Sequence, residues 1–197
     1  PKHRVAKKLL KMLSVPLAAP SANISSKLSP TSAKDVVDKF GNNLKFILDG
    51  GKCKIGLEST IIDLTNKPQI LRYGSITRKQ VEKILKIKIK TSANTKNIKA
   101  PGQMKLHYSP GLPVKLNRKY AEKNQAFIGL GKKFGRGKNR FNLSKKGNLK
   151  EAANNLYRIL RKIKNSNFKS IAVTKIPNTG IGYAINEKLR KASNKWI

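Results

Sequence analysis

The proline-rich segment 16–31, PLAAPSANISSKLSPT, is the part of the chain whose residue types best suit ligand binding. Its prolines fix the backbone, and the small residues between them offer hydroxyl, amide and main-chain groups with little side-chain bulk. Ser21 and Asn23 lie two residues apart, so an extended segment would point both to one side, where they could donate hydrogen bonds to phosphate oxygens. An ordinary proline–serine loop that binds nothing is the alternative.

Polar residues beside two apolar runs give two further, separate candidates. Glu58 and Ser59 stand at the entrance to the run 60–62, and Arg72 follows the run 69–71. Polar groups at strand ends are frequent site positions in α/β folds, and a guanidinium can hold a phosphate through two hydrogen bonds. Taken singly, Glu58 and Ser59 also fit a cap or a turn, and Arg72 also fits a surface or structural role.

Two ring side chains, His107 and Tyr108, lie between proline-bounded turns in the string 100–110, APGQMKLHYSP. Two rings in such a loop suggest that they dock on something. The glycines between residues 129 and 137 lack the G-x-G-x-x-G spacing of a dinucleotide loop. The two histidines and the single Cys53 are too few and too scattered for a structural zinc site, so no metal ligand is predicted.

Short apolar runs alternate with helical patterns, which predicts a mixed α/β fold. Helices are expected where apolar residues recur at helical spacing or a capping box is present, and strands where short apolar runs lie between turn residues. The expected helices span residues 5–13, 32–40, 77–85, 149–164 and 183–192, and the expected strands span 46–48, 60–62, 69–71, 126–130 and 170–173. The apolar stripe of helix 149–164 should pack against a sheet.

The apolar periodicity fades between residues 86 and 113 into polar residues followed by prolines and glycines, which is typical of a linker. We therefore expect one domain in residues 1–88, a linker in 89–113 and a second α/β domain in 114–197.

Charge and composition limit the function classes. The chain of 197 residues carries a formal charge of +35, which suggests polyanionic partners or a composition bias towards lysine. No stretch approaches the roughly 18 apolar residues of a membrane helix, so no membrane partner is predicted. Lys11 and Pro16 interrupt the early apolar stretch, which argues against a secretory signal. A lone cysteine fits a reducing cytoplasm, the expected location.

The order of the motifs resembles the threonylcarbamoyl-AMP synthase family in its long, two-domain form. The resemblance rests on PLAAPSANISSKLSPT, LDGGKCKIGLESTIIDLT, ILRYGSIT, APGQMKLHYSPGLPV, EAANNLYRILRKI and IPNTGIGYAINEKLRKAS. It implies the C-terminal part of a YrdC-like twisted open α/β sheet domain, linked to a small Rossmann-like α/β domain. The linker would fold back over the active site.

Enzymes of this family condense L-threonine, bicarbonate and ATP into threonylcarbamoyl-AMP and pyrophosphate, for the threonylcarbamoyladenosine modification of tRNA. The resemblance implies a threonine site formed by Ala19 and Ser59. It implies ATP contacts from Ser21, Asn23, Ser29, Arg72 and Tyr108. Magnesium would accompany ATP without a protein cage, held by phosphates and water. Proteins that transfer the threonylcarbamoyl group would be downstream partners.

Family members carry a basic K-x-R element and a threonine-contacting arginine upstream of the segment with which this chain begins. We therefore expect an N-terminally truncated chain whose catalytic residues cannot be named, and which alone is inactive or poorly folded. A double-stranded RNA or tRNA binding module without catalysis is the alternative, because the family's first domain has a positively charged concave surface. RNA affinity should fall steeply with salt, and binding of ATP and threonine much less so. For the C-terminal domain alone, lid support or partner docking is the modest expectation.

Overall fold

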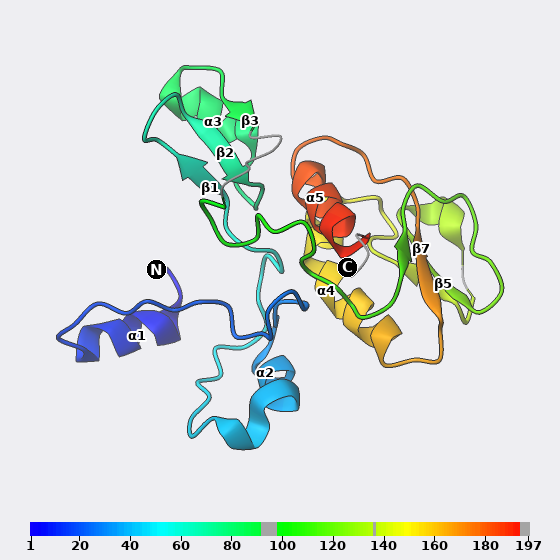
Figure 1. The fold of residues 1–197 in the computed structure, drawn as a ribbon, viewed down its shortest axis with the longest axis horizontal. Coiled ribbons are helices and arrows are strands. Elements are labelled where there is room, and N and C mark those ends of the chain that lie inside the picture. The colour runs from blue at the N-terminus through cyan, green and yellow to red at the C-terminus, as the bar shows by residue number, and fades with distance from the viewer. Residues whose placement is uncertain (92–97, 136, 194–197) are drawn as a thin grey trace.

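The computed structural model describes residues 1–91, 98–135 and 137–193, and Figure 1 shows two separate β-sheets joined by extended chain. The elements before the second sheet are α1 (Arg4–Met12), α2 (Ala33–Phe40), the 3-10 turn η1 (Gly41–Asn43), β1 (Ile61–Asp63), β2 (Gln69–Arg72), α3 (Arg78–Leu85) and β3 (Lys90–Thr91). They are followed by β4 (Val114–Lys115), β5 (Gln125–Gly129), the 3-10 turn η2 (Lys132–Phe134), β6 (Arg140–Asn142), α4 (Leu149–Lys164), β7 (Ser170–Val173) and α5 (Gly182–Ser193).

Capping boxes fix the start of two helices in the first half of the chain. The Ser32 side chain accepts from the Asp35 backbone N–H while the Asp35 carboxylate accepts from the Ser32 backbone N–H, and α2 begins there. Thr77 and Gln80 make the same reciprocal pair at the start of α3. Both capping boxes that the sequence predicts are therefore confirmed.

The first sheet is small and has the order β1-β2-β3, with β1 antiparallel and β3 parallel to β2. Its core consists of Ile70, Val81 and Ile89, so the helix α3 covers a minimal apolar cluster. The pairing of β3 with β2 continues this sheet past residue 88. The domain limits at residues 88 and 113 remain predictions.

The second sheet has the order β4-β7-β5-β6, and all three pairings are parallel. Parallel strands need crossover connections, and α4 and α5 provide buried apolar faces for such a sheet. Ile128 and Ile171 of the strands share one buried cluster with Leu156 and Leu160 of α4 and Ile185 of α5. The predicted α/β class is confirmed, and helix 149–164 packs with the sheet as its apolar stripe predicts.

The structure differs from the predicted elements at Phe46–Leu48, where the residues form no strand and Phe46 is 91% exposed. A strand needs a neighbouring strand to bind its backbone N–H and C=O groups, and no described strand pairs with this run. Conversely, β3, β4 and β6 are only two or three residues long and have too little alternation to be predicted from sequence.

The loop that carries His107 and Tyr108 returns to the proline-rich segment. Ser109 forms an isolated parallel bridge with Lys27, and the Ser109 backbone N–H donates to the carbonyl of Ser26 at 2.9 Å.

The helices of the described residues are all too short or too polar to cross a membrane.

Candidate functional site

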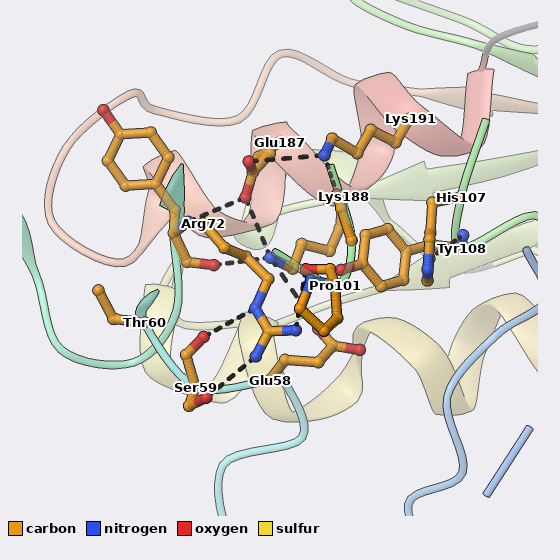
Figure 2. Close-up of polar contacts among 12 residues, drawn as sticks. Glu58, Ser59, Thr60, Arg72, Pro101, His107, Tyr108, Glu187, Lys188 and Lys191 are labelled. Carbon is orange, nitrogen blue, oxygen red and sulfur yellow. Dashed lines mark hydrogen bonds and ion pairs between the residues drawn. The ribbon is translucent and has the colours of Figure 1, made fainter. Parts of the chain in front are cut away.

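Arg72 and Ser59 contact each other in the first half of the chain (Figure 2). Arg72 Nε donates to the Ser59 carbonyl oxygen at 2.9 Å, and Nη2 lies 3.0 Å from Ser59 Oγ. Nη1 lies 3.4 Å from the carbonyl oxygen of Pro101, which follows β3 along the chain. The guanidinium is thus held between the entrance of β1 and the predicted linker.

Strand register explains why these two residues meet. Ile61 of β1 lies opposite Arg72 at the end of β2, so Ser59, two residues earlier, comes beside the guanidinium. Gly74 lets the two chains approach closely. A Cβ at Gly74 would meet the backbone of residues 58–60, so a side chain there would push the chains apart.

Tyr108 is buried against the second half of the molecule, which consists of the second sheet with α4 and α5. Its ring stacks on the ring of Tyr157 from α4 at 5.9 Å between centroids, and its backbone adopts a positive φ of 61°. The Tyr108 hydroxyl has no hydrogen-bond partner among residues 1–91, 98–135 and 137–193, and it lies against Gly102 and near Arg72. Burial, together with the Glu58 carboxylate, raises the pKa of Tyr108 above its ordinary value.

Glu58, the residue before Ser59, binds three parts of the chain. Its Oε1 accepts from Ser29 Oγ at 2.6 Å. Tyr157 Oη lies 3.0 Å from Oε1 and 2.9 Å from Oε2, and Lys188 Nζ lies 3.9 Å from Oε2. The carboxylate therefore joins the proline-rich segment, the entrance of β1 and the helices of the second half.

A second set of contacts reaches the chain just after Arg72. Lys188 is 1% exposed and its Nζ donates to the carbonyl of Tyr73 at 2.6 Å and to Glu187 Oε2 at 3.0 Å. The same Glu187 oxygen accepts the Tyr73 backbone N–H at 3.1 Å. Lys191 donates to the carbonyl of Gly102. Burial lowers the pKa of both lysines, against the opposing effect of Glu187.

One face of α4 carries three residues that contact the first half of the chain. Asn154 Nδ2 donates to the carbonyl oxygens of residues 53 and 54, at 2.9 and 2.8 Å. Tyr157 makes the carboxylate contact described above, and Arg161 Nη2 donates to the carbonyl of Ser29 at 2.8 Å. These residues follow one another at helical spacings of three and four, so they share a face.

The remaining predicted site residues lie in the proline-rich segment. Ser21 and Ser29 line a cavity of about 750 Å³ together with Glu58 and Tyr157. The segment is not extended at Ser21, because the Asn23 backbone N–H bonds to the Ser21 carbonyl at 2.9 Å. This turn breaks the alternation that was expected to align the two side chains.

The Asn23 side chain is held by hydrogen bonds within its loop, whereas Ala19 lies at the surface. The Asn23 amide donates within its own loop, to the carbonyls of Ile24 and Lys27, and its Oδ1 is buried with no partner in the described residues. Ala19 is exposed. Among the predicted residues, the contacts thus join Ser29, Ser59 and Arg72 through Glu58, with Tyr108 packed beside them.

Sequence reasoning missed Tyr157, Glu187 and Lys188 as parts of this arrangement. A signal for Lys188 was present, because it lies between Ile185 and Leu189 on a stripe that is otherwise apolar. A lysine at such a position must find partners when the helix packs.

The charges of this cluster can hold an anion but do not form a metal cage. Within the part of the chain that the structure describes, Lys188 lies near the carboxylates of Glu58 and Glu187, and Lys191 lies near that of Glu187. In the described ranges 1–91, 98–135 and 137–193, no group of three or more His, Cys, Asp or Glu side chains could hold a metal ion. Arg72 is the cation whose partners, a hydroxyl and two carbonyls, are neutral groups that a phosphate could replace.

Two family models match the sequence. The model described as "Threonylcarbamoyl-AMP synthase, C-terminal domain" matches residues 76–194, and the one described as "Telomere recombination" matches residues 1–74. Threonylcarbamoyl-AMP synthase of Pyrococcus abyssi is 36% identical over 215 residues, covering 100% of this chain. The Bacillus subtilis protein of that name is 31% identical and covers 98% of the chain.

The solved structures agree with these matches. A crystal structure of P. abyssi Sua5 complexed with L-threonine superposes with a TM-score of 0.86 at 33% identity, over 98% of this chain and 62% of that chain. The chain spans 63% of the length of the P. abyssi relative and 61% of the B. subtilis one. By its sequence and its fold, the chain belongs to the threonylcarbamoyl-AMP synthase family.

Proposed function

We propose that this chain acts in the synthesis of threonylcarbamoyl-AMP from L-threonine, bicarbonate and ATP. The observation that carries the proposal is the contact between Arg72 and Ser59 beside the buried Tyr108. It brings a group suited to phosphate next to a group suited to a small polar substrate. The names of the relatives and the threonine complex of the similar structure support the same reaction.

In this reaction the threonine amine combines with bicarbonate to give a carbamate and water. A carbamate oxygen then attacks the α-phosphorus of ATP, and the bond to the leaving pyrophosphate breaks. The residues of this chain serve to position the reactants and to offset negative charge on the phosphates. Arg72 suits the second task, because its planar fork binds phosphate oxygens in pairs.

We assign the other residues by the chemistry of their groups. Ser59 and the main chain at Ala19 hold threonine. The hydroxyls and amide of the proline-rich segment, Ser21, Asn23 and Ser29, contact ATP. Tyr108 closes the site from the linker, where its buried ring excludes water from the labile carbamate and mixed anhydride.

Magnesium enters this proposal with the nucleotide. Glu58, the carboxylate beside Ser59, already binds Ser29 and Tyr157. The metal would therefore rely on phosphate oxygens and water, as is common for Mg²⁺, where it neutralises phosphate charge. The proposed setting is the cytoplasm, and the proposed partners are tRNA and the proteins that transfer the threonylcarbamoyl group.

The experiment measures pyrophosphate release from ATP and Mg²⁺, with threonine and bicarbonate added together and singly. Because the relatives are longer, the chain is assayed alone and joined to the part of the P. abyssi relative that it does not span. Release by either protein that needs both threonine and bicarbonate supports the proposal. Release that is independent of threonine, or none from either protein, contradicts it.

Arg72→Gln and Arg158→Gln form a matched pair for this assay. Both remove a guanidinium, but Arg158 is an exposed residue of α4 bonded to Asn155. Only the change at Arg72 should abolish release. Binding of double-stranded RNA with a steep salt dependence, in a protein that binds neither substrate, would instead favour the RNA-binding alternative.

A further inference from the structure

The pair Arg72–Ser59 is flanked on both sides by contacts to the second half of the molecule. Glu58 precedes Ser59 in the chain and binds Tyr157 of α4. Tyr73 follows Arg72, and Lys188 of α5 binds its carbonyl. Neither helix contributes a residue to the predicted substrate contacts, yet together they hold both neighbours of the pair.

The Glu58 carboxylate is the centre of this arrangement. Its side chain is 12% exposed, and that of Lys188 is 1% exposed. A carboxylate so far from water needs hydrogen-bond donors, and removing one leaves a charge that is poorly compensated. Tyr157 supplies a hydroxyl to both carboxylate oxygens, and Ser29 supplies another to one of them.

From these contacts we infer that Tyr157 and Lys188 are positioning residues, which hold Glu58 and Tyr73 and through them place Ser29, Ser59 and Arg72 for substrate binding. The inference rests on the proposed function for the identity of the substrates. The positioning itself rests only on the contacts. Loss of the Tyr157 hydroxyl should let Glu58 turn towards water and draw Ser59 away from Arg72.

Tyr157→Phe is the sharpest test, because it removes the hydroxyl and keeps the ring that stacks on Tyr108. Exchange of the Arg72 Nε–H, which donates to the Ser59 carbonyl, is followed by NMR in the protein without substrates. We expect faster exchange in the variant, together with threonine binding that is weaker by about tenfold in calorimetry. Lys188→Met should act in the same direction, through Tyr73 and Glu58.

Ile163→Val is the matched control. It also changes a fully buried residue of α4, but it lies in the apolar core rather than at Glu58. Thermal unfolding of each variant reports its loss of stability. If Ile163→Val gives the same exchange and the same threonine affinity as Tyr157→Phe, Tyr157 has a merely structural role and the inference is wrong.

The outcomes separate this inference from the proposed function. Unchanged Arg72 exchange and unchanged threonine affinity in Tyr157→Phe would overturn the inference, even if the parent chain binds both substrates. Faster exchange in Tyr157→Phe alone, in a chain that binds no threonine, would support the positioning and contradict the proposed function. Should Lys188→Met fail to fold, Tyr157→Phe still decides the question.

Discussion

Arg72 donates hydrogen bonds to both the carbonyl and the hydroxyl oxygen of Ser59, so two residues that we assign to different substrates satisfy each other. A phosphate that binds Arg72 must replace some of these contacts. The Ser59 hydroxyl would then be free to bind a second ligand. The pair therefore links the two proposed binding events.

The first prediction is that a non-hydrolysable ATP analogue raises the affinity for threonine by about fivefold, which corresponds to about 1 kcal/mol of coupling. Calorimetric titration of threonine, with and without the analogue and Mg²⁺, measures it. Thermodynamic reciprocity requires threonine to raise the affinity for the analogue by the same factor. In Ser59→Ala the coupling should vanish, and coupling that persists there would rule out this explanation.

Arg72→Lys should weaken binding of the ATP analogue by about tenfold to a hundredfold. Lysine keeps the charge but lacks the planar fork that makes paired hydrogen bonds to phosphate. Calorimetry with the analogue measures the loss. Arg158→Lys on the exposed part of α4 is the matched control. Unchanged affinity in Arg72→Lys would show that the positive charge alone is enough, and an equal loss in both variants would show that the effect is not specific to Arg72.

Gly102→Ala should disturb both the linker and Tyr108. Gly102 has φ +83°, and a Cβ there would meet the Tyr108 hydroxyl and come within 3.2 Å of Arg72 Cδ. Gly147→Ala provides the comparison, because Gly147 also has a positive φ, of +72°, but open space around it.

For Gly147→Ala we expect a loss of about 1 kcal/mol in unfolding free energy from backbone strain alone. Gly102→Ala should cost more than this, and it should also weaken binding of the ATP analogue. Urea unfolding and calorimetry measure the two effects. Equal stability losses, with unchanged nucleotide binding, would mean that the contact with Tyr108 and Arg72 is unimportant.

Asp63 at the end of β1 should make the free energy of unfolding depend on pH in the acidic range. The Thr65 hydroxyl and backbone N–H, and then Gln69, hold the pKa of Asp63 well below its usual range. At a pH between the folded and the unfolded pKa of Asp63, the unfolded chain therefore binds more protons than the folded chain. The contribution of Asp63 to the free energy of unfolding is fully present above the unfolded pKa of about 3.9, and it is lost as the pH falls towards the folded pKa.

Asp63→Asn should accordingly flatten the fall of the unfolding midpoint in urea between about pH 5 and pH 2. Asp38→Asn, which changes a half-exposed carboxylate paired with Lys34 on α2, is the matched control. The same flattening in both variants would show that the acid dependence has another source.

Local signals made parts of the fold predictable. The bounds of α4 and β7 match the predicted ranges, and both capping boxes lie where the spacing of Ser32–Asp35 and Thr77–Gln80 puts them. These features depend on residues within a few positions of one another. The run Phe46–Leu48 has the composition of a strand but lacks a partner in the described chain, and composition cannot supply one.

The site was predictable as a set of residues but not as an arrangement. The sequence motifs named Arg72 and Ser59, yet their mutual contact depends on the register of β1 against β2. Tyr157 was not among the predicted site residues. Its hydroxyl contacts Glu58, which is 99 residues away in the chain, and no local sequence pattern can predict such a distant partner.

The contacts of Asn154, Tyr157 and Arg161 on one face of α4 also restrict where the chain can change length. Each residue added to an α-helix turns everything beyond it by about 100°. A single insertion between residues 154 and 161 would point Arg161 away from Ser29 while Asn154 stayed in place. Surface loops can absorb such an insertion. The length of this stretch of α4 is therefore fixed by the geometry of the first half of the chain as well as by the core that the helix covers.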